Sequence, residues 1–80
     1  MAKDPKNHWH TVEPGSTSSD INGFGMVNGH FRVTFMHKGK HSEYQYTTDE
    51  KDICCNMAMS TSIGRFFERF VRPLPYAKLS

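Results

Sequence analysis

The 80-residue sequence predicts a single α+β domain, in which a three-stranded antiparallel meander is followed by two short helices that pack on one face of the sheet. Three observations predict this fold class. Apolar and polar residues alternate in the middle of the chain, an Asn-Gly pair precedes the first alternating stretch, and apolar residues near the C-terminus recur at helical spacing. A chain of this length buries only about 60% of its unfolded surface, so it has room for one small core but little room for an enclosed active site.

The N-terminal quarter of the chain differs in composition from the rest. Residues 1–19 contain many turn formers and few apolar side chains, so they are expected to form a polar, disordered tail. The domain is expected to span residues 20–76, with residues 77–80 as the C-terminal end. Trp9, the only tryptophan, is the exception in the tail, because it could fold back onto the domain or dock on a partner.

The first two strands are predicted on either side of a tight turn. Residues 21–27 are a strand candidate, although two glycines weaken it. Asn28 and Gly29 follow, and this pair is the strongest short hairpin signal because both residues tolerate positive φ. In the second strand Phe31, Val33 and Phe35 alternate with Arg32, Thr34 and Met36, which gives one apolar face.

The third strand is predicted after a second turn at residues 37–40. In this strand Tyr44 and Tyr46 alternate with polar residues, so the two tyrosines project from the same face of the sheet.

Two helices are predicted after the sheet. Thr47 and Glu50 have the spacing of a capping box. A short apolar stripe at helical spacing then consists of Ile53, Cys54, Met57 and Ala58. The second helix is expected to begin at Ser62, as its N-cap, and to end before Pro73. Its apolar face consists of Ile63, Phe66, Phe67, Phe70 and Val71, and its charged face of Arg65, Glu68, Arg69 and Arg72.

Composition and charge argue against several classes of protein. The net charge of +2 is smaller than the basic excess of a typical duplex-DNA binder. No apolar run approaches the ~20 residues that cross a bilayer, and the N-terminus lacks the apolar core of a signal peptide, so a cytoplasmic location without a membrane partner is expected. Cys54 and Cys55 are adjacent, and neighbouring cysteines rarely pair, so both thiols are expected to be reduced.

Several short patterns, taken in their order along the chain, resemble the KTSC domain family over residues 18–76. These patterns are Ser18-Ser19-Asp20-Ile21, Phe31-x-Val33-x-Phe35 with Gly39 after it, Tyr44-Gln45-Tyr46, Ser62-x-Gly64-Arg65-Phe66-Phe67-x-Arg69-x-Val71-Arg72, and Tyr76. The sequence departs from the family at Glu68 and Phe70, where asparagine and histidine are common. KTSC domains occur at the C-terminus of some lysyl-tRNA synthetases and as free-standing bacterial and phage proteins. The resemblance implies no established activity, but an RNA-binding role has been suggested for the family.

The resemblance and the residue pattern favour a small, non-enzymatic module that is associated with RNA. The tyrosine pair could stack on bases if its face of the sheet is open, or it could pack under the second helix, here called the aromatic helix, with its hydroxyls at the rim. The arginines of the second helix suit phosphates, although a helix that faces water also needs charges. The predicted nucleic-acid-binding residues are Tyr44, Tyr46, Arg32, Lys40, Arg65, Arg69 and Arg72.

The rival prediction is a protein-interaction module, such as a phage-encoded modulator of a host enzyme. Trp9 and Phe24 are then the partner-binding residues, together with an exposed sheet edge. Open strand edges also permit a weak homodimer as well as a monomer. The two predictions differ in salt dependence, because phosphate contacts weaken steeply with salt and an aromatic docking surface does not.

No metal, cofactor or catalytic site is predicted. The chain has five histidines and two cysteines, but structural zinc normally takes four ligands. His37 and His41 have a permissible spacing but flank a turn, and Cys54 and Cys55 project in different directions from a helix. A Cys–His nucleophile pair is formally possible, yet no nucleophile elbow, oxyanion loop or base-orienting group accompanies it. The sequence therefore favours a binding protein over an enzyme.

Overall fold

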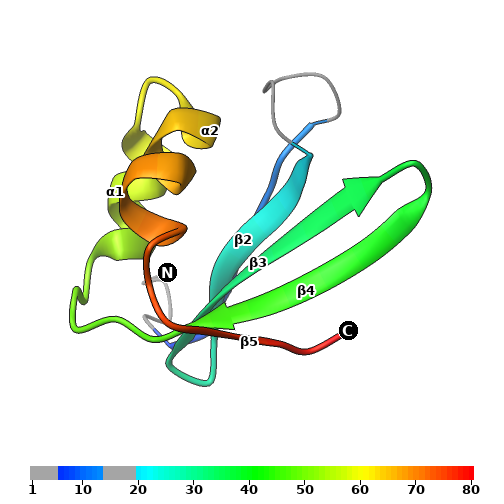
Figure 1. Ribbon diagram of the computed structural model, residues 1–80. Helices are drawn as coiled ribbons and strands as arrows, with labels where there is room; N and C mark the ends of the chain where they lie inside the picture. Colours follow the sequence, from blue (N-terminus) through cyan, green and yellow to red (C-terminus); the bar gives the residue numbers. More distant parts are fainter. Residues whose placement is uncertain (1–5, 14–19) are drawn as a thin grey trace.

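The computed structural model describes residues 6–13 and 20–80, which form an antiparallel sheet with helices on one face (Figure 1). The elements in chain order are β1 (His8–Thr11), β2 (Ile21–Val27), β3 (His30–His37), β4 (Lys40–Tyr46), α1 (Ile53–Met59), α2 (Ile63–Phe66), the π-helical turn η1 (Phe67–Val71) and β5 (Tyr76–Lys78). The strands lie in the order β1-β2-β3-β4-β5. Residues 1–5 and 14–19, which belong to the predicted tail, lie outside the described residues.

The α+β class is confirmed, but the sheet has five strands rather than the predicted three. β1 comes from the stretch expected to be a loose tail, and it pairs with β2 so that His8 is opposite Met26. β5 follows the helices and pairs with β4, with Tyr76 opposite Tyr46. Both are edge strands of only four and three residues, and such short segments contain too little alternation to be recognised in the sequence.

Both predicted hairpin turns are confirmed. Asn28 (φ 51°) and Gly29 (φ 82°) join β2 to β3, and Lys38 (φ 50°) and Gly39 (φ 79°) join β3 to β4. Two consecutive residues with positive φ form the type of turn whose twist matches that of the strands it connects. The turns therefore fix the register of the three central strands.

The core lies between the inner face of the sheet and the helices. The most deeply buried large side chains are Phe24, Phe31, Val33, Met57 and Val71. They come from β2, β3, α1 and η1, so both layers contribute. Figure 1 shows the helices over one end of the sheet, whereas the β3–β4 hairpin extends beyond them. The inner face of the sheet is therefore covered at one end and uncovered toward the hairpin.

The aromatic helix widens in its second half. Ser62 caps α2 as predicted, because its side chain accepts a hydrogen bond from the Arg65 N–H (3.3 Å). Farther along, the Arg72 N–H donates to the Phe67 carbonyl five residues earlier (2.8 Å), which is π-helical geometry. The extra residue in this turn breaks the spacing of the predicted apolar stripe. Phe70, predicted to be buried, is 55% exposed, so that part of the prediction is wrong.

The helices are short, and α1 begins later than predicted. The capping box at Thr47 and Glu50 does not form, because the Thr48 hydroxyl accepts the Glu50 N–H instead (3.0 Å) and the helix starts at Ile53. Within residues 6–13 and 20–80, no helix is long and apolar enough to cross a membrane.

The indole of Trp9 lies on the outer face of the sheet, over β2. An added Cβ at Gly23 would lie 2.7 Å from the indole Nε1, and one at Gly25 would lie 2.8 Å from Cε3. The two glycines that weaken β2 as a predicted strand therefore provide the space in which the indole lies. Of the two alternatives for Trp9, the ring folds back onto the domain, although 43% of the residue remains exposed.

Candidate nucleic-acid interface

Three aromatic side chains from neighbouring strands form a row on the inner face, at the boundary between its covered and uncovered parts. They are Phe35 of β3, Tyr44 of β4 and Tyr76 of β5, and we call them the aromatic row. The ring centroids are 5.6 Å apart between Phe35 and Tyr44 and 5.5 Å apart between Tyr44 and Tyr76, and both pairs meet edge to face. Tyr76 is 62% exposed, and the other two are partly buried. The row is thus an aromatic surface that solvent reaches.

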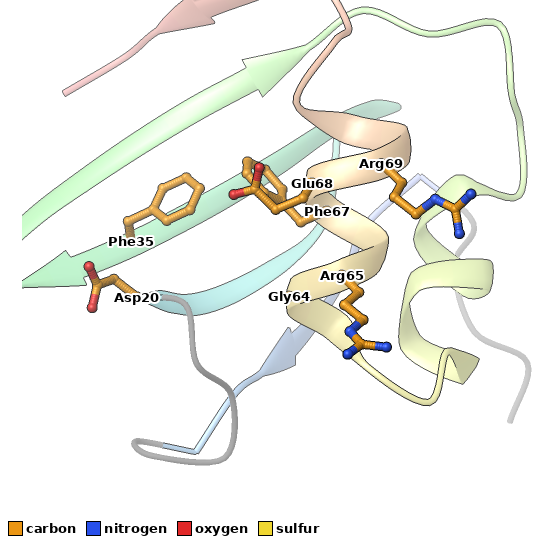
Figure 2. A pocket seen from close by; sticks show the side chains of 7 residues that line it. All are labelled: Asp20, Phe35, Gly64, Arg65, Phe67, Glu68 and Arg69. Carbon is orange, nitrogen blue, oxygen red and sulfur yellow. The ribbon is translucent and has the colours of Figure 1, made fainter.

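A groove runs between the aromatic row and the helix formed by α2 and η1. Its first part has a volume of about 510 Å³, and Figure 2 shows Phe35 and Phe67 next to one another in its lining, with their rings edge to face at 5.2 Å. Its second part, of about 370 Å³, extends over the aromatic row. The two parts share Asp20, Phe35 and Phe67 in their lining, so they adjoin.

Tyr46 is a core residue and not part of the exposed surface. It is only 6% exposed, and its ring lies edge to face with Phe67 at 5.9 Å. Burial raises the pKa of Tyr46 to about 12, and the nearby Tyr44, Tyr76 and Glu68 add smaller contributions in the same direction. Of the two alternatives for the tyrosine pair, Tyr46 therefore packs under the aromatic helix, while Tyr44 stays at the surface.

The raised pKa of Tyr46 predicts a loss of stability at alkaline pH. In the unfolded chain the phenol ionises near 10.0, whereas in the fold it stays neutral up to about pH 12. Between these values the unfolded state releases a proton that the folded state keeps. The contribution to stability is therefore intact below pH 10 and falls as the pH rises toward 12.

Urea denaturation below pH 10 and near pH 12 measures this effect, with Tyr46→Phe as the control. The variant has no phenol to ionise, so its stability should fall less than that of the wild type across this range. Identical pH profiles for the two proteins would show that Tyr46 does not have a raised pKa.

Cationic side chains surround the aromatic row. Lys40 and Lys78 lie on its side of the sheet, because they alternate with outward-facing neighbours in β4 and β5. In the part of the chain that the structure describes, neither lysine forms an ion pair. Arg72 lines the second part of the groove and donates to a Glu68 carboxylate oxygen (2.7 Å), and this hydrogen bond raises the pKa of Arg72. Its guanidinium is therefore charged at any physiological pH.

The three arginines of the predicted row line two adjoining parts of the groove. Arg65 and Arg69 line the first part of the groove, but Figure 2 shows their guanidinium groups extending away from Phe35. The Arg69 guanidinium carbon lies 5.9 Å from the centre of the Phe70 ring. Arg72 lines the other part of the groove, because the π-helical turn changes the spacing on which a shared face depends.

Arg32 lies on the outer face of the sheet, away from the groove. Its Nε donates to Gln45 Oε1 (3.0 Å), and its Nη1 lies 3.4 Å from a Glu43 carboxylate oxygen. Gln45 is opposite Arg32 in the β3–β4 pair, and Glu43 lies two residues along β4 on the same face. Arg32 is therefore separated from the aromatic row by the sheet, which corrects its assignment to the same binding surface.

Trp9 and Phe24, the predicted partner-binding residues, do not form one surface. Phe24 is 1% exposed and its ring stacks on His10 at a centroid distance of 5.2 Å, so it belongs to the core. Trp9 lies on the outer face. The assignment of Phe24 to a docking surface is corrected by its burial, and Trp9 alone remains accessible.

Tyr76 is the surface residue that sequence reasoning missed. It follows Pro73 and Pro75, which give the segment no recognisable strand pattern, and its pairing partner Tyr46 is thirty positions earlier. The available signal was the alternation of Tyr76 with Lys78, which places an aromatic and a cationic side chain on one face.

Comparison of the chain with protein-family models, with curated proteins and with solved structures finds no match in any of the three. The resemblance to the KTSC family therefore stays a prediction, and the geometry of the groove is what bears on function.

Proposed function

We propose that the chain is a small, non-enzymatic module that binds single-stranded RNA in the groove beside the aromatic row. The observation that carries this proposal is the row of Phe35, Tyr44 and Tyr76 along the groove, with Tyr44 partly exposed and Tyr76 largely exposed. Aromatic side chains on a sheet surface are the means by which several protein modules hold unpaired bases, because every base has a flat π-face. Bases in a duplex are already stacked, so single strands are the expected ligand.

The charges around the groove support the same ligand. Lys40 and Lys78 flank the aromatic row without an ion pair in the described chain, and both are available to phosphates. Arg72 is held by Glu68 in an exposed ion pair, and an exposed pair contributes little stability, so a phosphate can replace the carboxylate. With so few phosphate contacts, affinity should depend on salt but less steeply than that of a large basic protein.

The affinity of Tyr44→Ala and Tyr76→Ala for a labelled oligouridylate tests the proposal. Stacking of a base on an aromatic side chain contributes about 1–3 kcal/mol, so each substitution should raise the dissociation constant roughly 5- to 150-fold. Tyr76 is the sharper test because it is 62% exposed and its truncation leaves the core intact. Fluorescence anisotropy at several salt concentrations provides the measurement.

Arg32→Ala is the matched control for this experiment. It removes a cation from the same sheet but from the outer face, so it should leave RNA affinity nearly unchanged, whereas Lys78→Ala should reduce it. Unchanged affinity in a folded Tyr76→Ala variant, or equal losses for Arg32→Ala and Lys78→Ala, would argue against the groove as the RNA site.

A protein-interaction module is the second candidate, because Trp9 is 43% exposed on β1, the terminal strand of the sheet. A partner can add an extended segment to such an edge and cover the indole at the same time. A pull-down from cell extract with and without nuclease separates the two candidates. Material that persists after nuclease and is lost with Trp9→Ala favours protein docking, whereas loss of all co-purifying material after nuclease favours RNA.

A further inference from the structure

A cluster of metal-binding side chains lies away from the groove, between β1 and α1. It consists of His8 and His10 of β1 and Cys54 of α1. One ring nitrogen of each histidine and the cysteine Sγ all lie within 4.8 Å of one another. None of the three residues lines either part of the groove. The cluster is therefore separate from the proposed RNA site.

We propose that His8, His10 and Cys54 bind one thiophilic divalent transition-metal ion, with Zn²⁺ as the expected occupant. Two imidazoles and a thiolate are ligands that zinc prefers, and the described cluster contains no carboxylate, so the hard ions Mg²⁺ and Ca²⁺ are not expected. The thiol binds as a thiolate, and its proton is released to solvent. Three protein ligands leave a fourth position for water.

The fold brings these three ligands together between β1 and α1. Positions 8 and 10 alternate with Trp9, so both histidines lie on the inner face of β1 while the indole lies on the outer face. The two imidazole rings meet edge to face at 5.5 Å, and the ring of His10 stacks on Phe24. In a tetrahedral zinc site the nitrogen and sulfur ligand atoms lie about 3.3–3.6 Å apart. Rotations of the three side chains that move these atoms by about 1 Å would therefore close the cluster around an ion.

Burial distinguishes the thiol of the cluster from its neighbour. Cys54 is 2% exposed and faces β1, whereas Cys55 is exposed and its Sγ contacts Met59 Sδ at 3.8 Å. The two histidines are partly buried, so an ion at this site would be partly shielded from solvent. One buried thiolate and two partly buried imidazoles hold their ligand atoms in a defined arrangement, whereas exposed histidines on flexible side chains do not.

The ion would join the edge strand β1 to helix α1. In the described chain β1 pairs with β2 alone, and it belongs to a stretch whose composition predicts a loose tail. Small domains often need a metal or a disulfide to supplement a limited core. Because a ligand that binds only the folded state stabilises it, zinc should raise the melting temperature of the chain.

Cobalt substitution tests this proposal directly. The full chain, freed of metal with a chelator and kept under a non-chelating reductant, should bind one equivalent of Co²⁺. The complex should show a thiolate-to-cobalt charge-transfer band and intense ligand-field bands, and one equivalent of Zn²⁺ should abolish both. Cys54→Ser should remove the charge-transfer band, and His8→Ala or His10→Ala should weaken Co²⁺ binding at least tenfold. Cys55→Ser and His41→Ala, on exposed positions outside the cluster, should change neither.

Each other outcome overturns the proposal. Absence of stoichiometric cobalt binding, retention of the charge-transfer band in Cys54→Ser, or its loss in Cys55→Ser would each exclude the cluster as the site. The histidine variants keep the test valid if Cys54→Ser fails to fold, because His8 and His10 are only partly buried. Circular dichroism of each metal-free variant verifies its fold. RNA affinity is measured separately on the same proteins, so failure of one proposal does not affect the other.

Discussion

Replacing Phe67 with alanine should lower the free energy of unfolding by about 3–5 kcal/mol. Phe67 is 7% exposed, and its ring lies edge to face with Phe35 at 5.2 Å and with Tyr46 at 5.9 Å. Alanine would remove one of the two buried side chains of η1, the other being Val71, and would leave an unfilled space in the lining of the groove. Domains of this size are typically stable by only about 5–15 kcal/mol, so this loss is a large fraction of the total. Urea denaturation followed by circular dichroism measures it.

Phe70→Ala is the matched control, because it removes the same side chain from the same turn. Phe70 is 55% exposed and contacts only Phe66 and Arg69 among the ring contacts of the described chain. Its truncation should therefore cost less than about 1 kcal/mol. Equal losses for Phe67→Ala and Phe70→Ala would indicate a regular α-helix with both rings in the core, and would contradict the π-helical turn.

Replacing Gly25 with alanine should also be strongly destabilising, by about 3 kcal/mol. The added Cβ would collide with the carbonyl oxygen of His8 as well as with the indole of Trp9. A backbone atom in a paired strand cannot move aside as a flexible side chain can. We therefore expect the β1–β2 pair to separate and the fluorescence of Trp9 to shift toward that of a solvent-exposed indole.

Gly23→Ala provides the comparison for Gly25→Ala. All three nearest atoms to a Cβ at Gly23 belong to the Trp9 indole, so Trp9→Ala should relieve this clash but not the one at Gly25. The double variants should show a favourable coupling of about 0.5–3 kcal/mol between Trp9 and Gly23. Trp9→Ala could instead restore the stability of Gly25→Ala as fully as it restores that of Gly23→Ala. In that case the His8 carbonyl would not be the obstacle, and the β1–β2 register would need revision.

The central part of the fold could be predicted because its signals are local. Asn28 and Gly29 specify a turn by their own conformational preferences, and Ser62 specifies a helix start through a hydrogen bond to a residue three positions away. The edge strands could not be predicted in the same way. β1 and β5 become strands by pairing with β2 and β4, which already form a sheet, and their own sequences contain little that requires it.

The candidate site was predicted in part for the same reason. Tyr44 and Tyr46 share a face by strand alternation, but which of them is covered depends on where the helix lies along the strand. Arg69 and Arg72 line different parts of the groove, and their spacing depends on a π-helical turn that the sequence pattern does not predict. His8 and His10 approach Cys54 only once β1 has joined the sheet, so the cluster proposed to bind metal could not be found from ligand spacing.

Backbone amide spectra recorded during titration with a single-stranded oligouridylate test the proposed function most directly. We expect the largest shifts at Phe35, Tyr44 and Tyr76 and at neighbouring positions of β3, β4 and β5, with the Trp9 indole signal unchanged. Shifts confined to β1, β2 and the Trp9 indole would place the ligand on the outer face and would contradict binding in the groove.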